Sequence, residues 1–173
     1  MGMSSKELGI VFFITVFFMI PGAKLGSMLS NKYNPLISLK IQHAIFIVST
    51  VTACLVLYTP DNKNFSYIFG VFWGLCMGWF YPTANLIFSL SLPTGQESEL
   101  TGFYILFSQI FNWLPPLLFV LLNEAGLDMQ WSFMSLTIFY DISLCFLVRM
   151  SPWNEIRLSA LEVSRMIIVF EED

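Results

Sequence analysis

Charged residues are scarce in this sequence. Asp, Glu, Lys and Arg make up 12% of its 173 residues, whereas soluble globular domains carry roughly 25%. Apolar residues account for 56% of the chain and aromatic residues for 17%, and they occur in long uninterrupted stretches. This composition excludes an ordinary soluble domain, and we expect the lipid bilayer to be the solvent of the chain.

The sequence also lacks the groups that several function classes require. Its eight Lys and Arg residues are scattered and its net charge is −4, which argues against a nucleic-acid partner. With one histidine and with Cys54, Cys76 and Cys145 each inside an apolar stretch, we expect no metal site and no disulfide framework, and we interpret the cysteines as small core residues. Neither a phosphate-binding glycine loop nor paired carboxylates within a span are present, so we predict no enzyme and no cofactor.

Five apolar stretches are long enough to cross a membrane, since a helix needs about 20 residues to do so. They lack the alternation of barrel strands and are therefore predicted to be helices. The stretches cover residues 8–29, 36–58, 65–92, 100–122 and 129–148. The predicted fold class is an all-α membrane protein of about five transmembrane helices, with residues 1–150 forming the bundle.

Basic residues in alternate loops predict the orientation, because they accumulate on the cytoplasmic side. Six lie on one side and two, Lys6 and Lys63, on the other. We therefore expect the C-terminus in the cytoplasm and the N-terminus on the opposite face. The lead before the first span is short, and we expect the chain to be incomplete at its start. The six basic residues on the predicted cytoplasmic side are Lys24, Lys32, Lys40, Arg149, Arg157 and Arg165.

Residues 151–173 differ in character from the spans. Glu155, Arg157, Glu162 and Arg165 alternate with apolar residues such as Trp153. One interpretation is a cytoplasmic amphipathic helix lying on the membrane surface, and the other is a disordered tail.

Two features within the spans concern helix packing and bending. Gly70, Gly74 and Gly78 recur every four residues, which favours close approach of a second helix. The alternative interpretation is a face along which two helices slide when a transporter gate moves, because such a face needs the same spacing. In the fourth span, Pro115 and Pro116 remove two backbone hydrogen bonds near mid-membrane and predict a kink or hinge.

Gln109 and Asn112 lie beside that kink. Two interpretations of these side chains stay open: they line a solute pathway, or they form hydrogen bonds with another helix. Interrupted helices mark many transporter binding sites, although prolines also make static bends.

Three further polar groups lie in or near the spans. Lys24 is close enough to the cytoplasmic loop for its side chain to reach the interface. The Asp141 side chain is too short to reach the interface from within the fifth span. Three interpretations of it stay open: a proton-coupling group, a partner for Lys24, or a neutral buried acid. His43 starts the second span, and two interpretations stay open: an interfacial histidine without a role, or a proton relay.

The loop between the third and fourth spans has the most specific pattern in the chain. Thr94 and Glu97 fit a capping box that would start the fourth helix. The loop holds two acidic residues and no basic one, unlike the other loops on its side. Its distinctive residues are Pro93, Gly95, Glu97, Glu99, Gly102 and Tyr104.

In these six residues, and in the Trp-Leu-Pro-Pro sequence that begins at Trp113, the chain resembles the autophagy-related vacuolar effluxers, a branch of the major facilitator superfamily. The resemblance implies that the five spans correspond to the eighth to twelfth of twelve, the C-terminal half without its first helix. It also implies export of amino acids from a vacuole or lysosome-like compartment to the cytosol by alternating access.

The expected partners are then the lipid bilayer, a small solute, and an N-terminal helical half or another subunit. Asp141 would lie on a peripheral helix. The alternative hypothesis is a membrane assembly protein that does not transport and that packs against another bundle through its glycine face.

Overall fold

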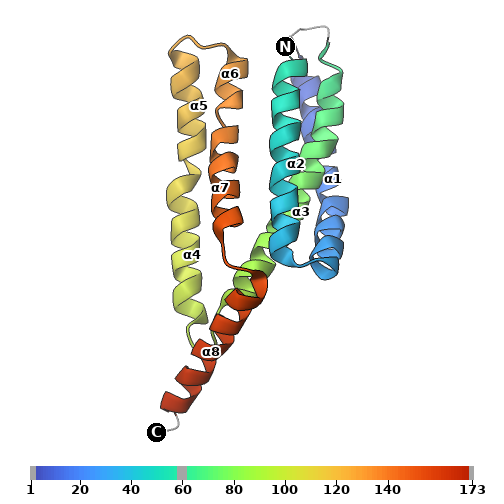
Figure 1. The fold of residues 1–173 in the computed structure, drawn as a ribbon. Coiled ribbons are helices and arrows are strands. Elements are labelled where there is room, and N and C mark those ends of the chain that lie inside the picture. Colours follow the sequence, from blue (N-terminus) through green and yellow to red (C-terminus); the bar gives the residue numbers. More distant parts are fainter. Residues whose placement is uncertain (1–2, 58–61, 172–173) are drawn as a thin grey trace.

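The computed structural model describes residues 3–57 and 62–171, and apart from 3₁₀ geometry at Asn62 every regular element in these ranges is an α-helix (Figure 1). The predicted all-α fold is confirmed. The end expected for the second span, at residue 58, lies outside the described residues. The helices are α1 (Ser5–Lys32), α2 (Pro35–Val56), α3 (Phe65–Ser91), α4 (Glu97–Asn112), α5 (Leu114–Glu124), α6 (Met129–Met134), α7 (Thr137–Arg149) and α8 (Trp153–Glu171).

The chain passes along the bundle five times in alternating directions. Helices α1, α2 and α3 form one antiparallel group, α4 continues into α5, and α6 continues into α7 to return beside α2 (Figure 1). The helix α8 then leaves the end of the bundle opposite to the start of α1. The two ends of the chain therefore lie at opposite ends of the molecule.

Four segments are long and apolar enough to cross a membrane, within the part of the chain that the structure describes. They are Ser5–Lys32, Pro35–Val56, Glu97–Glu124 and Gln130–Arg149. The third predicted span, α3, is absent from this set because its Trp, Tyr and Gly residues lower its mean hydropathy. Its 27 residues carry no charge and extend about 40 Å, which exceeds the roughly 30 Å of the hydrocarbon core.

Polar side chains cap the starts of α1 and α2, and one of them also joins α1 to the turn before α3. Ser4 and Glu7 form a capping box, in which each side chain accepts from the other residue's backbone N–H. Lys63, just before α3, donates to Glu7 over 2.9 Å. This hydrogen bond raises the pKa of Lys63, so the pair holds the first turns of α1 and α3 together at neutral pH. Asn34 caps α2 by accepting from the N–H of Ile37.

The predicted fifth span is two helices rather than one. The helix α6 ends at Met134 and α7 begins at Thr137. The Ser135 hydroxyl donates to the carbonyl of Ser132 over 2.7 Å, and the Thr137 hydroxyl donates to that of Met134 over 2.8 Å. Such hydroxyl bonds compete with the helical pattern and accompany bends.

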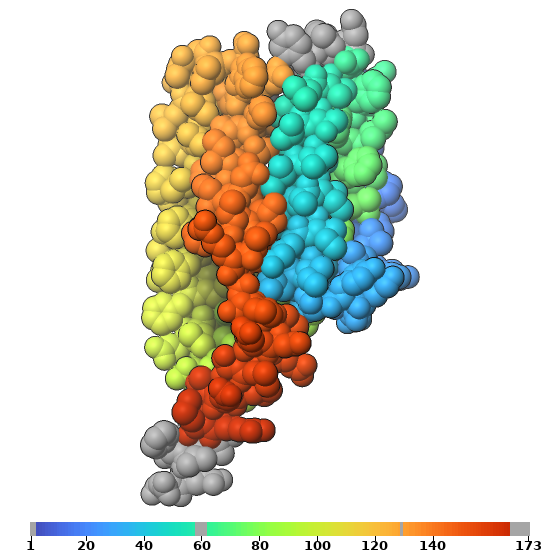
Figure 2. Space-filling view, viewed as in Figure 1, coloured from blue at the N-terminus to red at the C-terminus, as the bar shows by residue number. Residues whose placement is uncertain are grey.

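Buried side chains concentrate around α2, which α6 and α7 cover on one side (Figure 2). By contrast, α4 and α5 contain no buried residue. The described part of the chain thus has a packed side and an open side. One core cluster joins Leu36, Leu39 and Leu147 to Phe80, Ile87, Trp153 and Ile156, and the other joins Ala53, Leu57 and Phe69 to Val56 and Trp73.

The helix α8 is attached to the bundle by its first turns and by one hydrogen bond. Trp153 and Ile156 pack on the cluster around Leu36, and the backbone N–H of Thr94 donates to Ser164 Oγ over 2.9 Å. This places α8 against the end of α3 and the following loop.

The backbones of α1 and α3 are in direct contact. A β-carbon added to Gly74 would collide with the carbonyl oxygen of Thr15, and one added to Gly78 would collide with the next turn of α1. The relation is mutual, because a β-carbon on Gly22 of α1 would collide with the carbonyl of Leu75. Neither helix can carry a side chain at these positions without moving away.

The same contact continues beyond these glycines in both directions. A β-carbon on Gly26 would lie 2.6 Å from the Trp79 ring, and one on Gly70 would lie 3.2 Å from the Val11 side chain. The stripe of α3 glycines is therefore covered by α1 of the same chain along its whole length.

We predict that Gly74→Leu separates α1 from α3 and lowers stability by about 1–3 kcal/mol or more, as overpacking does in closely packed cores. Thermal unfolding in detergent measures the loss. The control is Gly9→Leu, because a β-carbon on Gly9 meets nothing within 4 Å. Equal destabilisation by the two substitutions would contradict the assignment of the contact.

Candidate functional site

The loop with the distinctive pattern lies at the α8 end of the bundle. Pro93 is buried, while Gly95, Glu97 and Glu99 are exposed. Gly95 has a φ of 94°, in the left-handed region that favours glycine. The loop is thus a tight turn that presents two carboxylates to the surroundings at the start of α4.

The expected capping box at Thr94 is wrong. The residue before α4 is Gln96, and no side chain caps the helix. Glu97 instead accepts from the backbone N–H of Gly95 over 2.9 Å. The N–H of Thr94 is taken by Ser164 of α8, which lies 70 residues later, so a long-range contact replaces the local one.

The other two residues of the motif lie on α4. Tyr104 stacks on Phe88 of α3, with ring centroids 4.2 Å apart and planes 19° apart. Gly102 faces open space, because a β-carbon there would meet nothing within 4 Å. One aromatic pair therefore fixes the start of α4 against the end of α3.

The fourth pass is interrupted at Trp113, between α4 and α5. Pro115 and Pro116 have no backbone N–H, so the carbonyls four residues earlier lose their helical partners. One of these carbonyls belongs to Asn112. Asn112 and Gln109 are both exposed on α4. The Asn112 carbonyl, which has lost its helical partner, and two amide side chains thus lie close together along one apolar pass, whereas the Phe111 carbonyl accepts from the N–H of Trp113.

His43 is buried between helices, with 3% of its surface exposed. Its Nδ1 lies 3.0 Å from the Leu39 carbonyl and its Nε2 lies 3.2 Å from Ser143 Oγ. The rings of Phe80 and Tyr140 flank it, each with its centroid 5.8 Å away. His43 therefore joins α2 to α7.

Two more polar contacts hold α2 against α3. The indole N–H of Trp79 donates to Ser38 Oγ over 2.8 Å. Gln42 is 1% exposed and donates through Nε2 to the Cys76 carbonyl over 3.2 Å. In hydrocarbon such contacts are a main source of helix association, because lipid tails are as apolar as the side chains they replace.

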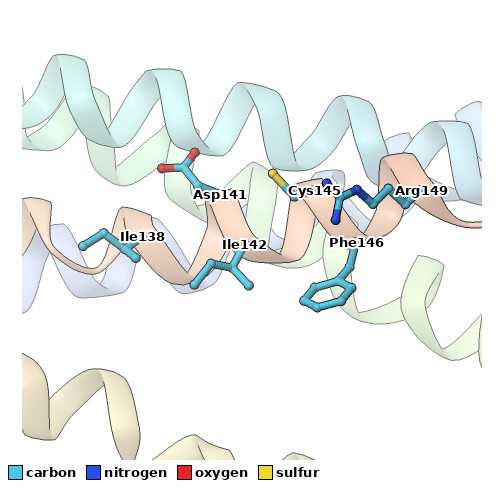
Figure 3. A pocket seen from close by; sticks show the side chains of 6 residues that line it. All are labelled: Ile138, Asp141, Ile142, Cys145, Phe146 and Arg149. Atoms are coloured by element: carbon cyan, nitrogen blue, oxygen red, sulfur yellow. The ribbon is translucent and has the colours of Figure 1, made fainter.

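Asp141 lies on the exposed face of α7, so it is not a buried acid of the bundle. It lines a shallow cavity of about 250 Å³, and Figure 3 shows that the lining side chains all come from α7. Lys24 is exposed on α1. Across residues 3–57 and 62–171, the one ion pair within 4 Å is that of Lys63 and Glu7. The shallow cavity beside Asp141 is lined by Ile138, Asp141, Ile142, Cys145, Phe146 and Arg149.

The sequence-predicted site residues therefore fall in separate places. The loop residues gather at one end, the amides and prolines lie on the open side, and Asp141 lies on α7 without them. Among the described residues, no group of three or more His, Cys, Asp or Glu could hold a metal ion. Cys54 and Cys76 are buried as expected, but Cys145 is exposed.

Comparison with known families decides the classification. A family model described as Major Facilitator Superfamily matches residues 1–116, which is more than half of the chain. The chain belongs to the Major Facilitator Superfamily. The match covers α1 to α4 and ends at the prolines that interrupt the fourth pass. No curated protein and no solved structure matches the chain.

Membership makes the chain part of an integral, multi-pass membrane transporter, whose partners are the bilayer and a small solute. The α1–α3 glycine contact and the polar contacts of α2 then form the packed framework of this facilitator chain. The interrupted α4–α5 pass is its least packed element and carries amide side chains.

Several residues of this framework were missed by sequence reasoning. Gly22 and Gly26 of α1 complete the contact with α3, and their spacing of four residues is the signal that identifies them. Ser4 and Glu7 likewise have the spacing of a capping box. No comparable signal identifies the contact of His43 with Ser143, because it joins helices 100 residues apart.

We predict that Ser143→Ala and His43→Ala together destabilise the protein by less than the sum of the single changes. The expected coupling is about 0.6 kcal/mol, and at most about 1.7 kcal/mol, as for other hydrogen bonds between membrane helices. A double-mutant cycle on thermal unfolding in detergent measures it. Ser108→Ala is the control, because that exposed hydroxyl donates only within α4. Additive effects would show that the two side chains do not interact.

Proposed function

We propose that this facilitator chain carries small neutral solutes of the amino-acid class out of a vacuole or lysosome-like compartment by alternating access. The observation that carries the proposal is the interruption of the α4–α5 pass at Trp113. Broken helices in membranes supply free carbonyls for a solute and a point at which a helix can bend.

The groups beside the interruption suit a neutral polar solute. Gln109 and Asn112 each offer a donor and an acceptor without a net charge, and both are exposed. An amino acid is a zwitterion that needs acceptors for its ammonium group and donors for its carboxylate. The Asn112 carbonyl and the amide oxygens supply the acceptors, and the amide N–H groups supply the donors.

The surroundings of the pathway support movement of one bundle against another. The helices α4 and α5 bury no residue, which leaves them available to an N-terminal half or to another subunit. In alternating access, two bundles rock about a solute held between them. The proposal therefore includes that the 173 residues do not transport without a partner bundle.

The vacuolar location, the autophagy-related role and the direction of export rest on the motif loop from Pro93 to Tyr104, which resembles that of the effluxers. A cytoplasmic C-terminus rests on the excess of basic residues at the α8 end. In that orientation α8 is a cytoplasmic helix, and its Ser164 contacts the motif loop.

A role in assembly without transport has less support. That hypothesis assigns the α3 glycine face to another protein, but α1 of the same chain covers this face. The family match also favours a transporter.

Efflux from membrane vesicles tests the proposal. Vesicles from cells that produce the protein are loaded with radiolabelled neutral amino acids, and efflux is compared between variants. We expect Asn112→Leu and Gln109→Leu each to slow efflux about tenfold, which corresponds to the loss of about 1.4 kcal/mol of stabilisation. Pro115→Ala combined with Pro116→Ala restores a continuous helix and is expected to slow efflux without lowering the amount of protein.

The matched control is Ser108→Ala, which changes a neighbouring exposed side chain of α4 and is expected to leave efflux unchanged. Unaltered efflux in all the amide and proline variants would contradict the assignment of the pathway. Uptake by the purified chain alone in liposomes, above that of empty vesicles, would contradict the need for a partner bundle.

A further inference from the structure

Two charged side chains lie on the outside of the bundle within membrane-crossing helices. Lys24 of α1 and Asp141 of α7 are both exposed, and neither makes an ion pair within 4 Å among the described residues. A charge in hydrocarbon is costly unless it reaches the interface or finds a partner. A Lys side chain can reach the interface, but the short Asp side chain at mid-span cannot.

The two charges lie at matching depth. Lys24 is eight residues before Lys32, the end of α1, and Asp141 is eight residues before Arg149, the end of α7. Eight residues correspond to about 12 Å along a helix. The helices α1 and α7 run in the same direction and end on the same side of the molecule (Figure 1). Lys24 and Asp141 therefore lie at about the same distance from the cytoplasmic surface in the orientation proposed above.

Each charge lies within an apolar stripe. Phe13, Phe17 and Ile20 are exposed on the face of α1 that carries Lys24. Ile138 and Ile142 are exposed beside Asp141 and line the shallow cavity with it (Figure 3). Away from the helix ends, each stripe thus carries one charge, and the two charges are opposite; on α7 the same cavity also reaches Arg149 at the end of the helix.

The two stripes lie on different sides of the chain. The helix α1 packs mainly on α3, whereas α7 packs mainly on α2. Lys24 and Asp141 of one molecule are therefore not placed to meet each other. Copies of the chain in one membrane have the same orientation. Rotating one copy about the membrane normal does not change the depth of its residues, so Lys24 of one copy lies level with Asp141 of the next.

We propose that these two faces form an interface between copies of this chain, in which Lys24 of one copy pairs with Asp141 of its neighbour. The contact joins two different surfaces and is therefore heterologous, so it builds a ring or an open row. Lipid is a poorer occupant of the α7 face, because acyl chains supply no donor to a carboxylate at this depth. The opposite charge at equal depth on the same sequence favours a second copy over an unrelated protein. This inference does not depend on the solute or on the direction of transport.

Disulfide crosslinking between differently tagged copies tests the interface. Met28 is exposed on the α1 stripe one turn beyond Lys24, and the native Cys145 is exposed one turn beyond Asp141, so these positions also match in depth. One copy carries Met28→Cys and Cys145→Ser, and the other keeps Cys145 as its partner cysteine. Mild oxidation in membranes is expected to link the two tags. The control replaces Met28→Cys with Ile41→Cys, an exposed position on α2.

Charge reversal then tests the pair itself. In the same crosslinking copies, Lys24→Asp in the first or Asp141→Lys in the second is expected to lower the yield about tenfold. Lys24→Asp and Asp141→Lys combined in opposite copies restore the attraction and are expected to recover the yield. Lys32→Asp is the matched control at the end of α1, and size-exclusion chromatography in detergent verifies that each variant is folded.

Three results would overturn the proposal. The first is a Met28→Cys yield no higher than that of Ile41→Cys. The second is a yield that both single reversals leave unchanged or that the combined reversal does not restore. The third is crosslinking of these faces to a different protein while the two tags remain unlinked.

Discussion

The glycines at the contact of α1 with α3 are the constraint on which the rest of the bundle depends. Lipid gives no hydrophobic force for helix association, so membrane helices hold together by close packing and hydrogen bonds. Glycines on both helices allow their backbones to touch. Once α1 and α3 are fixed, Trp79 and Cys76 of α3 present a donor and an acceptor to α2, and His43 of α2 joins α7. Each of these helices thus contacts a helix whose position is fixed by an earlier contact.

The α4–α5 pass contributes least to this framework, and its helix α5 packs against α6 rather than against α1, α2 or α3. It buries no residue and is fixed at its start by the stacking of Tyr104 on Phe88. The contrast between a packed framework and one open, interrupted pass is physically suited to a facilitator, in which a bundle must keep its shape while part of its surface meets another bundle and a solute. The contact of α8 with the motif loop adds a second fixed point at the same end.

Hydropathy predicts the all-helical membrane fold because a bilayer permits few other solutions, and helix length follows from its thickness. The spacing of Gly70, Gly74 and Gly78 identifies a face but not the helix that meets it, because any of the other passes could have done so. The position of His43 could not be predicted, since its burial depends on the rotation of α7. The error at Thr94 has a similar origin: a distant serine on α8 takes the N–H that a local cap was expected to explain.

The most direct test of this account measures the contact between α1 and α3 in the membrane. A β-carbon on Gly70 would lie 3.2 Å from the Val11 side chain, so the pair Val11→Cys and Gly70→Cys is close enough for a disulfide within one molecule. With the native cysteines replaced by serine, mild oxidation is expected to close this disulfide rapidly. The pair Gly9→Cys and Gly70→Cys is the reference, because Gly9 faces open space. Equal rates for the two pairs would contradict the packing of α1 on α3, and with it the framework described above.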